Sequence, residues 1–490
     1  AKAALNNNLS EGRLAICYLG HGSYRGLSQE RVIVADDISN WNNENKYPLL
    51  ITATCSFSAY DDPSFYSAGE LTFLKENGGT IGLFTTTRLV YASGNKHLTD
   101  DVYDNLFERD DAGMPKRLGD VIRLAKNENV GNNTRKFSLL GDPSMRLAMP
   151  LYQVKTTFIN GQPTETVDSD TLNALEPLLL EGEIRDYNDN LLNDFNGEIT
   201  ITVFDKEQTL STLGQDGGSQ VADFKLRNTV LFKGVASVSN GQWAIEFILP
   251  QDIDFEIGQG KISYYAQDGE HTDAWGTYEN IYIGGINEDA VQDTEAPEIR
   301  VYINDTNFVS GGITDQFPNL YVELFDDQGI NISSSGIGRT PFAILNDGEQ
   351  RYSLERFYRS NMDDTRSGSI TYPMGRLAPG QYRVEVKAWD IQNNSGTGFT
   401  EFVVLENDKN VIENLINYPN PFSNRTIFAF EHTLAGTDAN IYIDIFNTQG
   451  QQVSSLALSN LRLGGYRVDG ITWEGDGSNG LSLPNGVYFY

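Results

Sequence analysis

The sequence predicts a multidomain protein in which an α/β layer with a parallel sheet is followed by all-β immunoglobulin-like sandwiches. The first 150 residues alternate short, continuous apolar runs with stretches of helical periodicity, whereas the rest consists of short alternating strands between Gly, Asn and Asp turns. Continuous apolar runs are typical of buried parallel strands, and alternating ones are typical of antiparallel sandwiches. A chain of 490 residues has room for three or four such domains.

In the α/β layer we expect three strands and three helices. The strands are expected at 13–20, 48–55 and 80–88, and the helices at 67–79, 97–109 and 117–128. Ser67 is a plausible N-cap of the first helix, and the pair Gly78-Gly79 is expected to end it. Three strands make a small sheet, and the chain begins without Met, so we expect the first part of this domain to lie in a longer precursor.

After Pro150 the sequence divides into three β blocks. Clear strand patterns occupy 199–206, 241–250 and 260–268, and an acidic, Pro-terminated segment at 287–297 reads as a linker. The predicted domains are therefore residues 1–150, 151–290, 291–407 and 408–490.

Composition excludes several classes of protein. The formal net charge of −31 would repel a phosphate backbone, so no nucleic-acid partner is expected. Such acidity favours an exposed, soluble protein, with structural calcium at some Asp/Asn clusters as the alternative. No run of about 18 apolar residues is present. His97, His271 and His432 lack partners at ligand spacing, so we expect no other metal and no cofactor.

The strongest functional signal is a His and a Cys at the ends of two buried strands. His21 follows the first strand and Cys55 ends the second, so both are expected at the same edge of a parallel sheet. A cysteine thiolate beside an imidazole is the nucleophile of cysteine peptidases, and the imidazolium can protonate the leaving amine. The N–H groups of Gly22 and Cys55 are candidate oxyanion donors. The alternative is a turn His and a small core Cys.

Two further residues are predicted to contact substrate. Arg88 and Tyr91 lie in the loop after the third strand, which leaves the same edge of the sheet. The alternative for Arg88 is a structural ion pair with a nearby acid.

The motifs CYLGHGS, TATCSF, SAGELTFLKENGGTIGLFTTTR and FSLLGDPSMRL resemble the second half of the catalytic domain of the gingipain family of cysteine peptidases, in the caspase–gingipain clan. The resemblance implies that His21 is the acid or base, that Cys55 is the nucleophile, and that Gly22 helps to form the oxyanion hole. Thr54 departs from the Ala that many clan members carry. The family's acid that orients the His has no counterpart here and is expected in a preceding segment.

The β blocks carry a second resemblance. Residues 418–432, 441–453 and 483–490 resemble the C-terminal signal domain of type IX secretion cargo, and 195–206, 241–268 and 386–404 resemble the sortase of that system. This resemblance implies a peptidase that cleaves C-terminal signals from cargo proteins and joins them to an anionic lipopolysaccharide through a thioester. It implies a location on the outer face of the outer membrane of a Gram-negative bacterium. The implied partners are a β-barrel shuttle protein, which binds from about Asn414 onward, and other surface attachment proteins.

Two alternatives remain open at this point. The chain could be a secreted gingipain-like protease that is itself cargo, or a non-catalytic surface scaffold or adhesin. Two large middle blocks favour the sortase over a cargo protease, and the presence of both His21 and Cys55 disfavours the scaffold.

Overall fold

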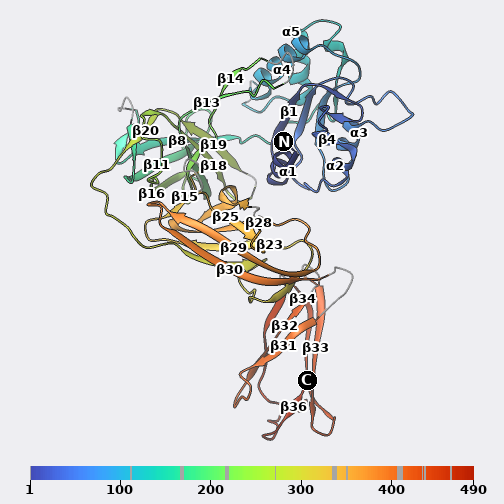
Figure 1. Cartoon of the computed structure of the whole chain (residues 1–490), viewed down its shortest axis with the longest axis vertical. Coiled ribbons are helices and arrows are strands. Elements are labelled where there is room, and N and C mark those ends of the chain that lie inside the picture. The colour runs from blue at the N-terminus through green and yellow to red at the C-terminus, as the bar shows by residue number, and fades with distance from the viewer. Residues whose placement is uncertain are drawn as a thin grey trace. The chain divides into compact units, whose positions relative to one another are not determined.

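The computed structural model in Figure 1 divides into two compact units, Ala1–Leu151 and Tyr152–Tyr490. It describes residues 2–110, 113–165, 170–215, 220–270, 272–333, 339–348, 351–405, 412–432, 434, 438–463 and 466–490. His271 and the predicted boundary at 407/408 lie outside these ranges. No helix of the described residues is long and apolar enough to cross a membrane.

The first unit is built on a four-stranded sheet of order β1-β5-β6-β7. Its strands are β1 (Ala15–Leu19), β5 (Leu49–Ala53), β6 (Gly82–Thr86) and β7 (Phe137–Leu140). The first three are parallel, as predicted, whereas β7 pairs antiparallel with β6. A second, small sheet consists of β2 (Gly22–Ser23), β3 (Gly26–Leu27) and β4 (Ile33–Val34).

Helices cover both faces of this sheet because successive β5 side chains point to opposite sides. Leu49 and Ile51 pack with α4 (Ala92–Leu106) and α5 (Leu118–Glu128). Leu50 packs on the other face, in a core that includes residues of α1 (Lys2–Glu11), α2 (Ala35–Ser39) and α3 (Ala68–Phe73). Figure 1 shows α4 and α5 together on one side of the unit, and α2 and α3 on another. The 3₁₀ turn η1 (Thr134–Lys136) precedes β7.

The predicted helix at 67–79 is shorter than expected. It begins after Ser67 as predicted, and the Ser67 backbone N–H donates to Glu70 Oε2 at 2.8 Å, but α3 ends at Phe73. The reason is that the following loop folds back, where the Asn43 amide accepts from Gly79 N–H at 2.8 Å and donates to Gly79 O at 2.9 Å. The helix expected at 97–109 begins earlier, at Ala92.

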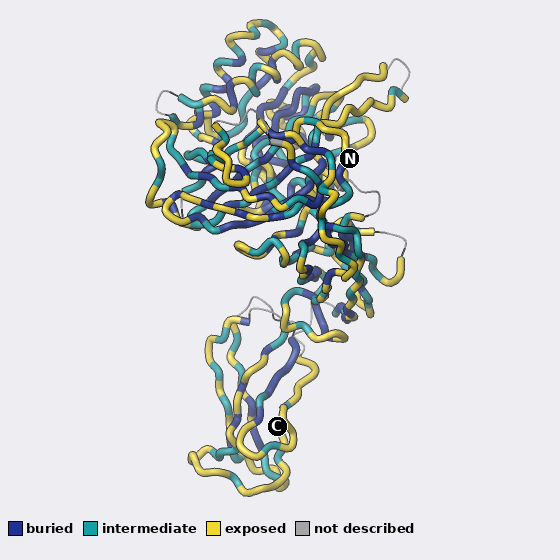
Figure 2. The backbone as a smooth tube through the Cα atoms, turned by 90° about the vertical axis from the view of Figure 1, so that its left-hand side faces the viewer, coloured by how far each residue is buried: buried dark blue, intermediate teal, exposed yellow. Residues whose placement is uncertain are grey.

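The second unit contains three hydrophobic cores, and Figure 2 shows buried positions alternating with exposed ones along its strands. In the first β block, β8 pairs with both β19 and β11, so the large sheet closes on itself rather than forming two open sheets. Its strands are β8 (Tyr152–Ile159), β9 (Gln162–Pro163), β11 (Pro177–Arg185), β12 (Gly197–Phe204), β15 (Val230–Ser239), β16 (Gln242–Ile248), β18 (Lys261–Gln267) and β19 (Asp273–Tyr278).

Two smaller sheets accompany this closed sheet. One contains β10 (Asp170–Ala174), β17 (Gly258–Gln259) and β20 (Ile281–Ile286), and the other is the hairpin of β13 (Gln208–Ser211) and β14 (Asp223–Leu226).

The second block is a sandwich of two sheets around one core. The first sheet has β21 (Glu298–Ile303), β23 (Asn319–Phe325), β27 (Tyr358–Asn361) and β28 (Asp364–Pro373). The second has β22 (Gly312–Thr314), β24 (Ile330–Asn331), β25 (Phe342–Leu345), β26 (Arg351–Ser353), β29 (Gly380–Asp390) and β30 (Ser395–Val404), and the 3₁₀ turn η2 (Glu355–Phe357) precedes β27.

The last block has two three-stranded sheets, which confirms the predicted succession of an α/β layer and all-β domains. Its strands are β31 (Ile412–Tyr418), β32 (Thr426–His432), β33 (Asp438–Asn447), β34 (Gln452–Arg462), β35 (Arg467–Trp473) and β36 (Tyr488–Phe489). Glu431, 5% exposed, accepts a hydrogen bond from Ile313 N–H at 3.1 Å, so this block is joined to the preceding sandwich by a buried contact.

Candidate active site

The ladder between β1 and β5 brings the predicted catalytic residues to one edge of the sheet. Leu19, the last residue of β1, pairs with Ala53, the last residue of β5. His21 and Cys55 each stand two residues beyond this pair. Because parallel neighbours keep a common direction, the two residues leave the sheet at equivalent positions on adjacent strands. The Cα atoms of His21 and Cys55 therefore lie at matching positions along the same edge of the sheet.

The backbone at His21 is fixed by its carbonyl oxygen. That oxygen accepts hydrogen bonds from the Tyr18 hydroxyl at 2.7 Å and from Ser28 N–H at 2.8 Å. The residue itself is exposed, and its imidazole makes no hydrogen bond or ion pair with any residue that the structure describes. The main chain is thus held while the ring remains open to substrate.

Cys55 lies on a tight turn after β5. Ser56, the next residue, has φ of 53°, a left-handed conformation that is uncommon for a residue with a side chain. The turn is held by Ser56 N–H to Arg88 O at 3.3 Å and by Ser58 N–H to Thr86 O at 3.0 Å. The half-buried thiol lies 3.6 Å from Val90 O. The Cys55 N–H makes no hydrogen bond to a described residue, as an oxyanion donor requires.

Gly22 and Thr54 connect the two segments directly. A Cβ atom at Gly22 would lie 2.6 Å from Thr54 Oγ1 and 3.1 Å from Thr54 Cγ2, so only glycine fits against this side chain. Gly22 follows His21 and Thr54 precedes Cys55, so the residues next to the predicted catalytic pair are in contact. Thr54 is fully buried, and its hydroxyl has no partner among the described residues.

Buried polar groups that the sequence analysis missed hold the end of β5. Asn95 on α4 donates to Ala53 O at 3.1 Å, and Asn133 donates to the Asn95 amide oxygen at 3.1 Å. The Asn133 Oδ1 in turn accepts from Tyr91 N–H at 2.8 Å. Asn95 precedes the helix predicted at 97–109, and it faces this network because α4 begins at Ala92 instead.

Arg88 and Tyr91 lie on either side of Val90, in the loop that reaches Cys55. The Arg88 guanidinium binds both carboxylate oxygens of Asp61, which is the ion pair expected as the alternative to substrate binding. Its hydrogen bonds hold the pKa of the Asp61 carboxyl below its usual value. Tyr91 is 74% exposed, and the Lys136 ammonium lies 5.5 Å from the centre of its ring. Tyr91 is therefore the more accessible of the two candidates.

A cavity that the sequence analysis did not predict begins two residues after His21. Its volume is about 500 Å³, and it is lined by the segment from Ser23 to Asp36 together with Phe65, Tyr66 and Ala68. Tyr24 packs on Phe65 with ring centres 4.4 Å apart, and Arg25 lies over the Tyr24 ring. Arg25 and Arg31 both face this cavity, and neither forms an ion pair with a described residue. The cavity therefore combines aromatic walls with two guanidinium groups.

Cys17, the second cysteine, differs from Cys55 in its surroundings. It lies within β1, and burial raises the pKa of its thiol, which disfavours the thiolate. The described residues contain one group of acidic, His or Cys side chains spaced for a metal ion, and it lies in the second unit.

Comparison with known proteins concerns mainly the first unit. The family model of peptidase family C25 matches residues 1–148, which is almost the whole of that unit. A comparison with curated proteins finds no significant match.

Among solved structures, the chain is similar to dimeric latent PorU from Porphyromonas gingivalis, with 28% identity and a TM-score of 0.35 over 84% of this chain and 39% of that one. It is also similar to the Arg-specific cysteine proteinase gingipain R, with 15% identity and a TM-score of 0.29 over 58% of this chain and 56% of that one. The chain thus spans about two fifths of the PorU structure and just over half of the gingipain structure.

Proposed function

We propose that this chain is part of a cell-surface cysteine peptidase that acts as a sortase. It cleaves the C-terminal signal from type IX secretion cargo and transfers the cargo to an amine acceptor. The observation that carries the proposal is the pairing of Leu19 with Ala53, which sets His21 and Cys55 at equivalent positions beyond adjacent parallel strands. The Gly22–Thr54 contact supports the proposal, because it joins the segment after β1, which carries His21, to the segment after β5, which carries Cys55.

The proposed reaction has two steps. The Cys55 thiolate attacks the carbonyl carbon of the scissile peptide bond, and the N–H groups of Cys55 and Gly22 stabilise the oxyanion. His21 donates a proton to the leaving amine as the C–N bond breaks, which leaves a thioester on Cys55. An acceptor amine, or water, then attacks the thioester carbonyl and loses a proton to His21, while the thiolate leaves. An amine acceptor gives transfer and water gives hydrolysis.

Surface features near the pair suggest where the two substrates bind. The exposed Tyr91 and Leu89 lie on either side of Val90, whose carbonyl contacts the Cys55 thiol, so this loop is suited to contact a peptide. We assign the peptide to this side. The cavity that begins at Ser23 is lined by Arg25 and Arg31 as well as by Asp36, and we assign the anionic acceptor to its two guanidinium groups.

The last block supports the sortase over a cargo protease. Cargo signals are removed, whereas Glu431 here is buried and accepts hydrogen bonds from Ile313 N–H at 3.1 Å and from Asn414 at 2.9 Å. Such a contact is suited to a permanent domain. We further propose that the protein lies on the outer face of the outer membrane and that its acceptor is an anionic lipopolysaccharide. Its proposed partners are a β-barrel shuttle protein, which binds from about Asn414 onward, and other surface attachment proteins.

The test uses the parent protein in cells, with Cys55→Ala beside a matched Cys17→Ala variant. The C-terminus of a cargo protein is followed by mass. We expect Cys55→Ala to accumulate cargo that keeps its signal, and Cys17→Ala to yield cargo that has lost the signal and gained the acceptor's mass. Normal maturation with Cys55→Ala would refute the proposal. If the wild type yields cargo that is cleaved but carries no added mass, the protein is a peptidase only, and the proposed transfer step is refuted.

A further inference from the structure

Three carboxylates from distant parts of the sequence meet in the second unit. Oxygens of Asp293, Asp326 and Asp327 all lie within 4.8 Å of one another. Asp293 belongs to the linker between the first two β blocks, and the other two follow β23. Oxygens bound to one Ca²⁺ at about 2.4 Å can lie at most about 4.8 Å apart. The spacing of these three oxygens therefore matches a shared ion.

Hydrogen bonds hold the linker in this place. Asp293 N–H donates to Gln392 Oε1 at 3.0 Å, and the Asn394 amide donates to Asp293 O at 3.1 Å. Gln392 also donates to Val291 O at 2.8 Å. Ile391 N–H donates to Gly329 O at 3.1 Å, so the turn after β29 lies beside the turn after β23. The three carboxylates are thus gathered by a built framework and not by a chance approach of exposed side chains.

The charges in this cluster are uncompensated. Asp293 Oδ2 is buried and has no hydrogen-bond partner among the described residues. Asp326 is 4% exposed, and its Oδ1 accepts hydrogen bonds from the N–H groups of Gln328 and Gly329. None of the three carboxylates forms an ion pair with a described Lys, Arg or His. An unpaired buried oxygen beside other carboxylates is costly unless a cation is present.

A fourth carboxylate increases the negative charge. Asp390, at the end of β29, is fully buried, and its oxygens accept from Gln392 N–H and from Asn394. Asp390 directly precedes Ile391, whose N–H donates to Gly329 O in the turn that begins at Asp326. The surroundings of Asp326 are therefore strongly anionic.

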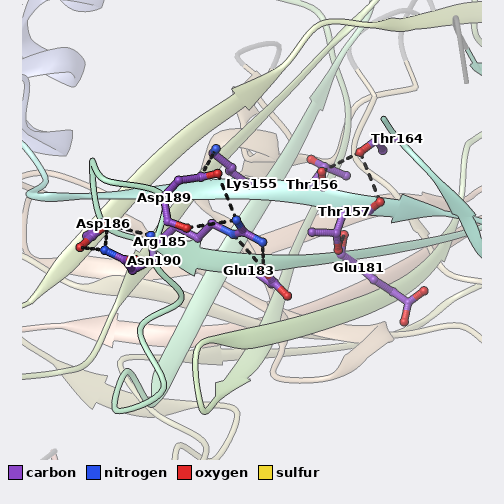
Figure 3. A network of polar contacts seen from close by, with 10 residues as sticks. All are labelled: Lys155, Thr156, Thr157, Thr164, Glu181, Glu183, Arg185, Asp186, Asp189 and Asn190. Carbon is purple, nitrogen blue, oxygen red and sulfur yellow. Dashed lines mark hydrogen bonds and ion pairs between the residues drawn. The ribbon is translucent and has the colours of Figure 1, made fainter. Parts of the chain in front are cut away.

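The acidic turn in Figure 3 provides a contrast within the same unit. There Asp189 is paired with Lys155 and Arg185, and Asp186 Oδ1 accepts from Asn190 N–H at 2.9 Å. Asn188 N–H, which the figure does not draw, also donates to Asp186 Oδ1 at 2.9 Å. This turn is as rich in Asp and Asn as the cluster, but its charges are balanced by protein groups. Asp content alone therefore does not mark a cation site, whereas the buried Asp293 Oδ2, which has no partner among the described residues, does.

We propose that Asp293, Asp326 and Asp327 bind one Ca²⁺ ion that fixes the linker at 287–297 to the second sandwich. Oxygen-only ligands from an irregular linker and a turn suit Ca²⁺, which accepts varied geometry, better than Mg²⁺, which requires near-ideal octahedral ligands. The site is independent of the proposed catalytic function, because its residues lie in the second unit.

The test measures thermal unfolding of the whole 490-residue chain in EDTA and in CaCl₂ at about 1 mM, a concentration suited to extracellular calcium modules. We expect Ca²⁺ to raise the melting temperature of the wild type and of the control Asp189→Asn. Asp326→Asn is expected to lose this response, and in EDTA to melt at or above the wild-type temperature, because it removes a repelled buried charge. Calorimetric titration is expected to show binding weakened at least about 10-fold.

The exposed Asp327→Asn is the second variant, since it removes a ligand without altering the core. A wild type that does not respond to Ca²⁺ would overturn the proposal, as would Asp326→Asn and Asp327→Asn variants that respond like Asp189→Asn. An equal response to MgCl₂ at the same concentration would overturn the assignment to calcium.

Discussion

The contact between Gly22 and Thr54 gives the sharpest test of the site's construction. In Gly22→Ala the new Cβ would lie 2.6 Å from Thr54 Oγ1, whereas ordinary contacts of such an atom begin near 3.4 Å. One of the two segments must therefore move by about 0.8 Å. Because Gly22 adjoins His21 and Thr54 adjoins Cys55, this movement separates the predicted catalytic pair.

Two magnitudes follow. Overpacking of this kind costs about 1–3 kcal/mol, so the free energy of unfolding of the first unit, measured in urea, should fall by that amount. A displacement near 1 Å in a catalytic site costs roughly 100-fold in rate, so the parent enzyme's turnover of a signal peptide should fall by about 10- to 100-fold. Both effects originate in one interatomic distance.

The double variant Gly22→Ala/Thr54→Ala isolates that distance. The Thr54 hydroxyl has no partner among the described residues, so its loss alone should cost little, whereas the loss of the buried Thr54 methyl should cost about 1 kcal/mol. Adding Thr54→Ala to Gly22→Ala should restore most of the lost stability and rate, because it removes the atom nearest to the new Cβ. The rescue should be incomplete, because Gly26 O still lies 3.2 Å from that Cβ. Wild-type behaviour of Gly22→Ala, or no rescue by Thr54→Ala, would refute the reasoning.

Three further predictions concern other parts of the chain. Burial lowers the pKa of His432, so the free energy of unfolding of its block should be highest above about pH 6.5 and should fall as the pH drops below that value. His432→Gln should weaken this pH dependence, measured by urea unfolding at several pH values. An equal pH dependence in His432→Gln and wild type would contradict the prediction. Glu431→Ala should cost about 1–3 kcal/mol, because it leaves the buried Ile313 N–H without its acceptor and leaves Arg467 paired with Asp469 alone. The exposed Glu413→Ala on the paired strand should be near neutral, and equal effects of the two substitutions would exclude the buried contact. Arg88→Ala should leave the free energy of unfolding nearly unchanged, since the ion pair of Arg88 with Asp61 is exposed, but it should raise the KM of the parent protein for peptide substrates. An unchanged KM would show that Arg88 only pairs with Asp61 and does not bind substrate.

The sequence was sufficient to predict the strand ends that carry the site. Continuous apolar runs stop at Gly20 and at Thr54, and a buried strand has to end where its apolar run ends, so His21 and Cys55 were expected at the sheet edge. Which strands are neighbours, and in which register, depends on the pairing of residues distant in sequence. The match of Leu19 with Ala53 therefore emerges only from the fold.

Other features were lost for the same reason. The early end of α3 depends on Asn43, which lies 36 residues before Gly79 and binds its backbone. β7 was not expected as a strand, because its four residues acquire their role only by pairing with β6. Asp293 was expected only as part of the linker at 287–297, and Asp326 was not singled out, because only folding brings their carboxylates together.

The most direct test of the central claim compares the two cysteines of the chain. The parent protein is treated briefly with iodoacetamide near neutral pH, and peptide masses give the alkylation rates of Cys55 and Cys17, in wild type and in His21→Gln. We predict that Cys55 reacts much faster than the half-buried Cys17, whose pKa is raised, and that His21→Gln slows Cys55 while leaving Cys17 unchanged. Equal rates at the two cysteines, or a Cys55 rate that does not depend on His21, would contradict the assignment of these residues as a catalytic pair.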